Sequence, residues 1–206
     1  MARSSKKTNE RSEGSSRQLY RDLIDHPSVL PYLEKLIAER EKGVEWEGRF
    51  YLSHEYGLQY KPDDWGFGFH NGGAPAKPWL RYHVQDGEIY CNLTCVTWCL
   101  TDVLEGEGGF GCLPGSHKAH FPAPEEIREL KLTPDTVHQP VVNAGDAIIF
   151  SEALIHGPLP YSGESDRLAL FYKYTPGHVP LMVERPSALL DQVTERQRQI
   201  LTVPHI

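Results

Sequence analysis

The stretch NAGDAIIFSEALIHGPLPYSGESDRLALFYKYTP, residues 143–176, decides the fold. It opens with a Gly-Asp turn, continues as an apolar run that ends at His156, crosses a loop containing Pro and Gly, and enters a second run at Arg167. Short apolar runs bounded by such turn residues predict β-strands. Because alternate residues of a strand share a face, the second strand would place Arg167, Phe171 and Lys173 on one side. A guanidinium in that position suits bidentate binding of a carboxylate.

The same pattern of strands and turns extends towards the N-terminus as far as about Val44. Six or more short strands joined by turns are typical of a closed barrel or a sandwich, so the sequence predicts an all-β core. Apolar residues at helical spacing predict short helices before this core and, at residues 187–201, after it. The polar start of the chain has no such periodicity. We therefore expect a disordered tail over residues 1–17 and a single domain over residues 18–206.

Composition disfavours several classes of function. A formal charge of −7 argues against a nucleic-acid partner, because phosphate binding requires clustered Lys and Arg. No apolar run approaches the roughly 20 residues that span a bilayer, and the start lacks the apolar segment of a secretory signal. We expect a soluble, cytoplasmic protein that binds no membrane. The four cysteines form no CxxC pair and are expected to be reduced and buried.

Four further features of the sequence indicate a particular protein family. They are LPGSHKAHFP at residues 113–122, WCLTDV starting at Trp98, the GDAIIF turn at residues 145–150, and the eleven-residue step from His156 to Arg167. In this order they resemble the phytanoyl-CoA dioxygenase family of non-haem iron, 2-oxoglutarate-dependent oxygenases. The resemblance implies a double-stranded β-helix, a jelly-roll or cupin-like barrel with short flanking N- and C-terminal helices, that holds Fe(II) and 2-oxoglutarate.

The resemblance also implies roles for single residues. His156 matches the distal iron-binding histidine, Arg167 matches the arginine that holds the far carboxylate of 2-oxoglutarate, and Trp98 matches an aromatic residue near the cosubstrate. The family's other ligands form a His-x-Asp pair, which completes a site of two histidines and one carboxylate. None of the ten histidines here has an acid two residues later. The first half of the metal site is therefore where this chain departs from the family.

Two histidines compete for that place. His70 follows the first predicted strand in the family's order, and Gly72 stands where the carboxylate is expected. His83 has an acid one residue late, at Asp86. We favour His70 and His156 as metal ligands, with Asp86 reaching the metal from a neighbouring strand.

Other polar groups leave alternatives open. Glu152 lies four residues before His156 on the same predicted strand, where it is either a substitute carboxylate, a hydrogen-bond partner or a structural group. His54 is a third choice for the first histidine. His117 and Lys118 belong to a loop that borders the active-site mouth in the family.

The expected catalytic residues are His70, His156 and Arg167. The favoured reaction is Fe(II)- and 2-oxoglutarate-dependent hydroxylation of an unactivated C–H bond in a small organic substrate by a monomer or homodimer. The His-x-Gly pattern at His70 also resembles the iron- and 2-oxoglutarate-dependent halogenases, in which chloride fills the position that the carboxylate leaves open. Halogenation is therefore one alternative, and a catalytically silent binding homologue is another.

Overall fold

The computed structural model describes residues 17–37, 50–64, 68–70, 80–119, 121–132, 135–177, 179, 181 and 185–202. Its main element is a four-stranded antiparallel sheet in the order β1-β8-β4-β6. The strands are β1 (Phe50–Tyr60), β8 (Arg167–Pro176), β4 (Thr94–Cys99) and β6 (Ala147–Ser151). The first and last strands of the core are thus neighbours in the sheet, which closes the chain on itself.

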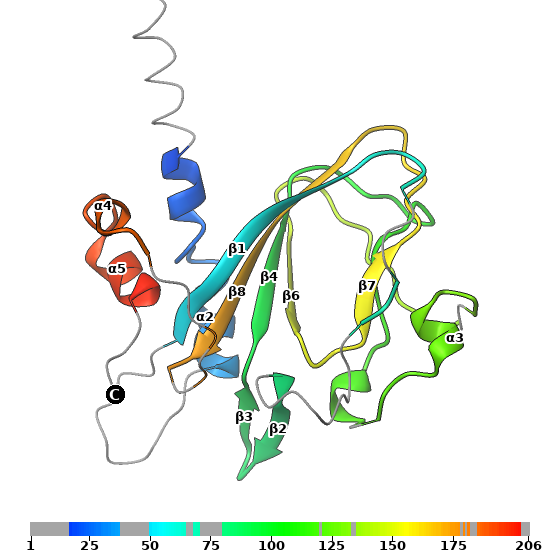
Figure 1. The fold of residues 1–206 in the computed structure, drawn as a ribbon, viewed down its shortest axis with the longest axis horizontal. Helices are drawn as coiled ribbons and strands as arrows, with labels where there is room; N and C mark the ends of the chain where they lie inside the picture. The colour runs from blue at the N-terminus through cyan, green and yellow to red at the C-terminus, as the bar shows by residue number, and fades with distance from the viewer. Residues whose placement is uncertain are drawn as a thin grey trace, which may run out of the picture.

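Two smaller antiparallel pairs accompany this sheet. Strand β5 (Gly109–Cys112) pairs with β7 (His156–Leu159), and β2 (Tyr82–Gln85) forms a hairpin with β3 (Glu88–Cys91). Figure 1 shows β7 on one side of the main sheet, while the hairpin projects beyond the end of β4.

Helices cover the other side of the main sheet (Figure 1). They comprise a helical segment at residues 17–22, α2 (Leu30–Leu36), α4 (Ser187–Leu190) and α5 (Glu195–Leu201). Helix α5 begins with a capping box in which Thr194 and Gln197 exchange hydrogen bonds. The remaining short helices, η2 (Ser116–Lys118) and α3 (Glu125–Arg128), lie in the connection after β5.

Alternation along β4 divides the core. Val96 and Trp98 point outward and pack among the helices in the largest hydrophobic cluster. Cys95 and Cys99 point inward and belong to two smaller clusters beside the inner strands. All four cysteines are free and buried, as expected from the sequence. Strand β4 is therefore buried on both faces.

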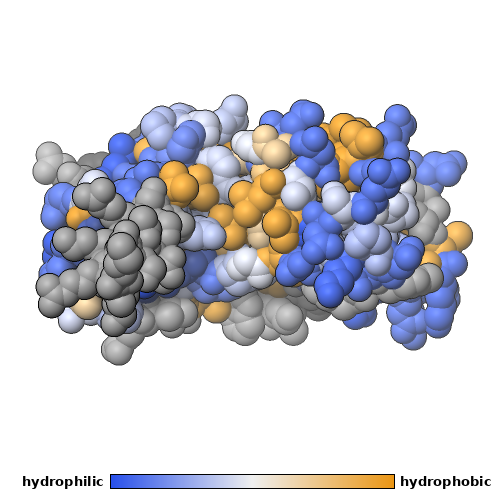
Figure 2. All heavy atoms as spheres, turned by 90° about the horizontal axis from the view of Figure 1, so that it is seen from above, coloured by the Kyte–Doolittle hydropathy of each residue, from blue (hydrophilic) through white to orange (hydrophobic). Residues whose placement is uncertain are grey.

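Surface apolar groups are spread over several loops and strands. In the view of Figure 2, apolar side chains gather near the middle of the face and hydrophilic side chains surround them. No described helix is both long and apolar enough to cross a membrane.

The mainly-sheet architecture with few helices confirms the predicted class of the core. One predicted strand was wrong in its extent: the apolar run that follows the Gly-Asp turn and ends at His156 is not continuous, because a turn and a bend at residues 152–154 separate β6 from β7. The two halves belong to different sheets, so the chain must leave one before it can join the other. Residues 1–16 of the predicted tail lie outside the described residues, while Arg17 is helical.

Candidate active site

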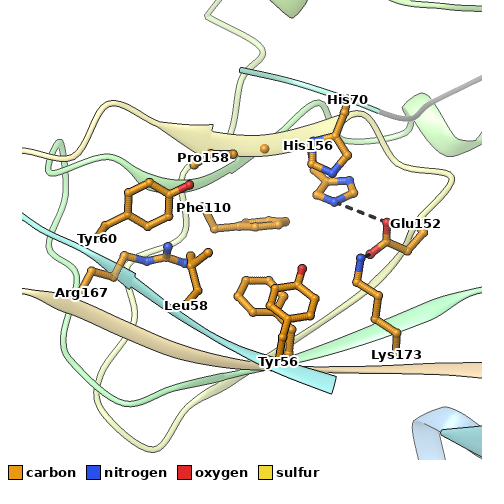
Figure 3. Close-up of a pocket in the computed structure, with 12 residues that line it drawn as sticks. Tyr56, Leu58, Tyr60, His70, Phe110, Glu152, His156, Pro158, Arg167 and Lys173 are labelled. Atoms are coloured by element: carbon orange, nitrogen blue, oxygen red, sulfur yellow. Dashed lines mark ion pairs between the residues drawn. The ribbon is translucent and has the colours of Figure 1, made fainter. Parts of the chain in front are cut away.

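A pocket lies between β1 and β8 of the main sheet and the β5–β7 pair. With the adjoining solvent it encloses about 440 Å³ not filled by protein atoms. The lining residues are Tyr56, Leu58 and Tyr60 from β1, Arg167, Phe171 and Lys173 from β8, Phe110 from β5, His156, Gly157 and Pro158 from β7, and His70 and Glu152. Figure 3 shows the histidines, Glu152 and Lys173 at one end and Arg167 with Tyr60 at the other.

His70 and His156 are held together by their own backbones. The His70 N–H donates to the His156 carbonyl at 2.8 Å, and the His156 N–H donates to the His70 carbonyl at 3.2 Å. Their ring centroids lie 4.4 Å apart. One ligand atom from each ring and one Glu152 oxygen all lie within 4.8 Å of one another. Two imidazoles and a carboxylate are the donor set of a facial iron site.

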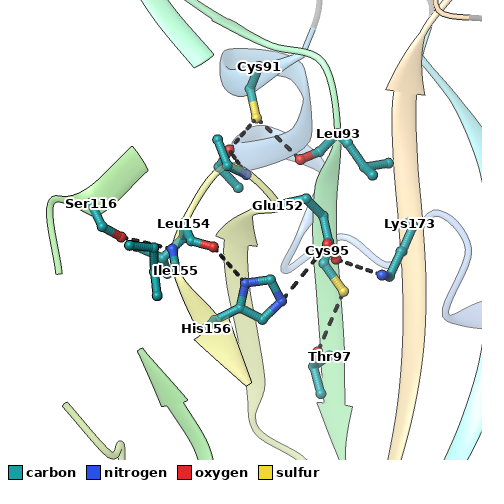
Figure 4. Close-up of polar contacts among 12 residues, drawn as sticks. Cys91, Leu93, Cys95, Thr97, Ser116, Glu152, Leu154, Ile155, His156 and Lys173 are labelled. Atoms are coloured by element: carbon teal, nitrogen blue, oxygen red, sulfur yellow. Dashed lines mark hydrogen bonds and ion pairs between the residues drawn. The ribbon is translucent and has the colours of Figure 1, made fainter. Parts of the chain in front are cut away.

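The backbone also orients the His156 ring. Its Nδ1 lies 2.8 Å from the Leu154 carbonyl oxygen, so Nδ1–H donates to that oxygen (Figure 4). The Nε2 lone pair then faces the Glu152 carboxylate, with 3.9 Å between Nε2 and Oε2. A hydrogen bond from the far ring nitrogen to a carbonyl is the usual arrangement of a metal-binding histidine.

Burial keeps both imidazoles neutral. It lowers the pKa of His70 to about 4, and the adjacent His156 acts in the same direction. Burial likewise lowers the pKa of His156, although the Glu152 carboxylate opposes it. Near pH 7 both rings therefore retain a lone pair that can bind a metal.

Glu152 is buried but remains charged. Burial alone would raise its pKa, yet the positive charges that can face it, on His156 when that ring is protonated and on Lys173, outweigh burial and hold the pKa below the usual range. The Lys173 ammonium lies 2.7 Å from Oε1 of Glu152. Burial would lower the pKa of Lys173, but the Glu152 charge outweighs it and raises the pKa. The two residues thus form a buried ion pair beside the histidines.

Arg167 supplies a second cation at the opposite end. Its guanidinium lies over the Tyr60 ring, 5.9 Å from the centroid, and its side chain is buried. Burial lowers its pKa, and no carboxylate of the described residues is among the charged groups that act on it. A buried guanidinium without an acidic partner is suited to an anionic ligand.

The walls between the two ends are mainly apolar. Tyr56 and Phe171 stack with their ring centroids 4.8 Å apart, and Phe110 and Leu58 complete the walls. Gly109 brings the β5 backbone close to Arg167, since a Cβ there would lie 3.1 Å from Nε. The pocket is therefore an apolar channel between one end with a buried guanidinium and another end with two imidazoles and a carboxylate.

The structure brings three predicted site residues together and separates two others from them. His70, His156 and Arg167 line the same pocket. Asp86 does not: it is exposed at the tip of the β2–β3 hairpin with φ 52°, followed by Gly87 with φ 82°. The placement expected for Asp86 is therefore corrected, because Asp-Gly with two positive φ values forms a tight hairpin turn that carries the carboxylate away.

Trp98 requires a correction as well. It faces the helices on the outer side of the sheet, where its ring lies edge-on to His26 with 5.2 Å between centroids. It does not line the pocket. Strand alternation alone does not reveal which face is the inner one, and the helices cover the Trp98 face.

The competing histidines lie elsewhere. His83 stacks on Tyr90 in the exposed hairpin, and His54 stacks on Tyr56 at the pocket's edge. His117 lies in η2 and packs edge-on against Tyr82 of β2. Gly72, which stands in the carboxylate position of the family pattern, lies outside the described residues.

Two pocket residues were underestimated from sequence. Glu152 was one of several open alternatives, and Lys173 was noted only for the face of its strand. The signal for Lys173 was present, because it lies six residues after Arg167 on the same face of β8. The signal for Glu152 was its position four residues before His156. The two side chains come into contact through a turn and not along one strand.

Comparison with known proteins agrees with this architecture. The family model of phytanoyl-CoA dioxygenase (PhyH) matches residues 2–169. The chain belongs to the phytanoyl-CoA dioxygenase family. The dioxygenase olcK of Penicillium canescens is 23% identical over 195 residues, covering 91% of this chain. The match covers 58% of olcK, so the chain spans less than two thirds of that relative.

Solved structures of other proteins have a similar fold. HygX from Streptomyces hygroscopicus with nickel and 2-oxoglutarate bound has a TM-score of 0.62 at 24% identity, covering 75% of this chain and 63% of HygX. The nickel complex of the non-haem monooxygenase ThoJ has a TM-score of 0.55 at 16% identity, covering 87% of this chain and 74% of ThoJ. At such identities the similarity establishes a shared fold.

Proposed function

We propose that the protein is an Fe(II)- and 2-oxoglutarate-dependent oxygenase that hydroxylates a C–H bond of a small organic substrate. The observation that carries the proposal is the two-ended pocket, with two neutral imidazoles at one end and a buried guanidinium at the other. We further propose that the facing sheets form a double-stranded β-helix within one domain over residues 18–206. Family membership and the cosubstrate bound by HygX support both proposals.

The donor set fits a divalent cation. His156 directs Nε2 into the pocket because Nδ1 is bonded to the Leu154 carbonyl. His70 is fixed beside it by the paired backbone hydrogen bonds, and a carboxylate lies against both rings. We therefore assign His70 and His156 as the imidazole ligands. When bound there with 2-oxoglutarate and O2, iron supplies the oxidising power of the reaction.

The chain's own residues orient the cosubstrate and exclude water. Arg167 binds the carboxylate of 2-oxoglutarate that lies far from the metal, since its planar fork pairs with two oxygens. Phe110, Leu58 and the Tyr56–Phe171 stack surround the path between the two ends. These apolar walls keep bulk water from the reacting atoms, which strengthens the charge interactions inside.

Hydroxylation is preferred here over halogenation. The halogenase hypothesis requires a coordination position without a carboxylate, whereas Glu152 lies within 4.8 Å of both imidazoles. A homologue that binds without catalysis would need neither neutral imidazoles nor, in the same pocket, a guanidinium that has no acidic partner among the described residues. The substrate itself must enter from the open side of the pocket, where Tyr56 is 41% exposed.

Anaerobic addition of Fe(II) and 2-oxoglutarate tests the proposal. The ternary complex should give the weak visible metal-to-ligand charge-transfer band, and its absence at millimolar 2-oxoglutarate would refute the oxygenase assignment. Arg167→Leu should weaken 2-oxoglutarate binding by about 100-fold, because two charge-assisted hydrogen bonds are lost. The control Arg196→Leu removes an exposed arginine of α5 and should leave the band unchanged.

A further inference from the structure

The two oxygens of Glu152 face different partners. Oε1 lies 2.7 Å from the Lys173 ammonium, and Oε2 faces Nε2 of His156 at 3.9 Å. The Glu152 side chain is 3% exposed and that of Lys173 is 13% exposed. Figure 3 shows the carboxylate between the lysine and the histidine pair. Oε1 thus pairs with the Lys173 ammonium, while Oε2 faces the imidazole of His156.

A short turn places Glu152 there. Strand β6 ends at Ser151, and the Glu152 N–H then donates to the Leu93 carbonyl at 2.9 Å. The turn is closed by hydrogen bonds from Leu154 N to Ser151 O at 2.9 Å and from Ala153 N to Ser151 Oγ at 3.1 Å. β7 starts at His156 immediately afterwards. The chain therefore crosses between sheets in four residues and carries both side chains to the same point.

A purely structural ion pair explains this arrangement poorly. Burying a carboxylate and an ammonium costs desolvation of both charges, and apolar residues of similar volume would fill the same space at lower cost. The pair lies inside a pocket and not in a closed core. Carboxylates that bind metals are themselves hydrogen-bonded by a neighbouring group, which is the position that Lys173 holds.

We propose that Glu152 supplies the carboxylate ligand of the metal site through Oε2, and that Lys173 positions and neutralises this carboxylate through Oε1. The inference rests on the proposed function and deepens it. The carboxylate that the family pattern places two residues after the first histidine comes here from the turn between β6 and β7. Lys173 is a positioning residue, because it acts on the metal through Glu152.

The charge of the site follows from this ligand set. The charges of Glu152 and Lys173 cancel, and imidazoles bind metals in their neutral form, so a divalent cation would keep its full charge in the pocket. The positive charge that remains at the site should favour binding of an anionic cosubstrate.

Co(II) binding to the metal-stripped full chain tests the role of Glu152. Calorimetry gives the affinity, and the Co(II) ligand-field spectrum reports the donor set. Glu152→Gln should change the spectrum and weaken Co(II) binding by at least about 100-fold. Loss of a group that only supports a ligand costs up to about 100-fold, and loss of the ligand itself should cost no less. The matched control Asp86→Asn, in the exposed hairpin, should leave both unchanged.

The role of Lys173 is tested by the same measurements. Lys173→Met should weaken Co(II) binding by about 10-fold or more and change the spectrum, because the hydrogen-bonding partner of the carboxylate is lost. Lys173→Arg keeps the charge and a donor and should retain the parent affinity and spectrum. Parent-like Co(II) affinity and spectrum in Lys173→Met would overturn this part.

Glu152→Gln leaves the Lys173 ammonium without its counter-charge, so folding is controlled with the double variant Glu152→Gln/Lys173→Met. This protein carries neither charge and should also lose Co(II) affinity. Parent-like binding and spectrum in either Glu152 variant would overturn the ligand assignment while leaving the proposed function intact. A parent protein that binds neither Co(II) nor 2-oxoglutarate would overturn both.

Discussion

Gly157→Ala should separate the two histidines of the site without touching either side chain. Gly157 follows His156 in β7, and a Cβ added to it would lie 2.2 Å from the Gly68 carbonyl oxygen and 3.1 Å from Cα of Phe69. Both contacts are with backbone, which cannot rotate away as a side chain can. Residues 68–70 must therefore retreat from β7, and His70 must retreat with them.

The size of the effect follows from this contact. Ordinary Cβ contacts begin at 3.4 Å, so the Gly68 carbonyl must move by more than about 1 Å, beyond the roughly 0.5 Å that a functional site tolerates. The 2.8 Å hydrogen bond from His70 N to His156 O would be lost or strained. We expect a stability loss of about 1–3 kcal/mol, typical of overpacking, and a loss of turnover of about 100-fold.

The assay compares Gly157→Ala with Gly57→Ala. Gly57 is also a strand glycine, and a Cβ there would meet only Leu170 Cδ2 at 3.7 Å, an ordinary contact. Urea unfolding gives the stability, Co(II) titration gives the metal affinity, and succinate release gives 2-oxoglutarate turnover. The reasoning is refuted if Gly157→Ala keeps metal affinity and turnover within about 3-fold of Gly57→Ala, since a displaced ligand should cost far more.

Three further outcomes are expected. The free energy of unfolding of the metal-free protein should fall by up to about 3 kcal/mol as the pH drops from 6.5 to about 4. In this window the unfolded chain protonates His70, whereas burial keeps the pKa of His70 in the folded protein near 4. Urea titrations should show a smaller dependence on pH in His70→Asn. Trp98→Phe should leave the 2-oxoglutarate dissociation constant unchanged and lower stability by about 1 kcal/mol, since Trp98 packs against the outer helices. Weaker 2-oxoglutarate binding in this variant would show that Trp98 does contribute to the site. Chloride should not shift the charge-transfer band of the parent protein, because the Glu152 carboxylate proposed as a ligand would fill the coordination position that a halide needs; a chloride-dependent shift would favour halogenation.

The parts of the site that sequence predicted depend on local geometry. The face shared by Arg167, Phe171 and Lys173 follows from the period of two along one strand, and all three residues line the pocket. The hairpin turn at Asp86 was also within reach, since Asp-Gly between two short alternating runs is a strong hairpin signal. The prediction that Asp86 binds the metal did not take this hairpin turn into account.

The parts that sequence did not predict depend on distant segments. The inner face of β4 is decided by helices formed from both ends of the chain, so Trp98 could not be assigned to a side from its strand alone. The break between β6 and β7 reflects a change of sheet, which an apolar run does not encode. The contact between Glu152 and Lys173 joins the turn after β6 to β8, and these two strands are not neighbours in the sheet.

The two histidines and the two cations of the pocket are attached to different layers of the protein. His156 belongs to the β5–β7 pair and holds His70 by its backbone, whereas both cations, Arg167 and Lys173, project from β8 of the main sheet. A cosubstrate bound at both ends would tie the two layers together as a non-covalent cross-link. Slower amide exchange should then appear in β7 and β8 together when metal and 2-oxoglutarate are both present, since ligation adds RT ln(1 + [L]/Kd) to the cost of opening. Binding of the cosubstrate would in this way stabilise the contact between the main sheet and the β5–β7 pair.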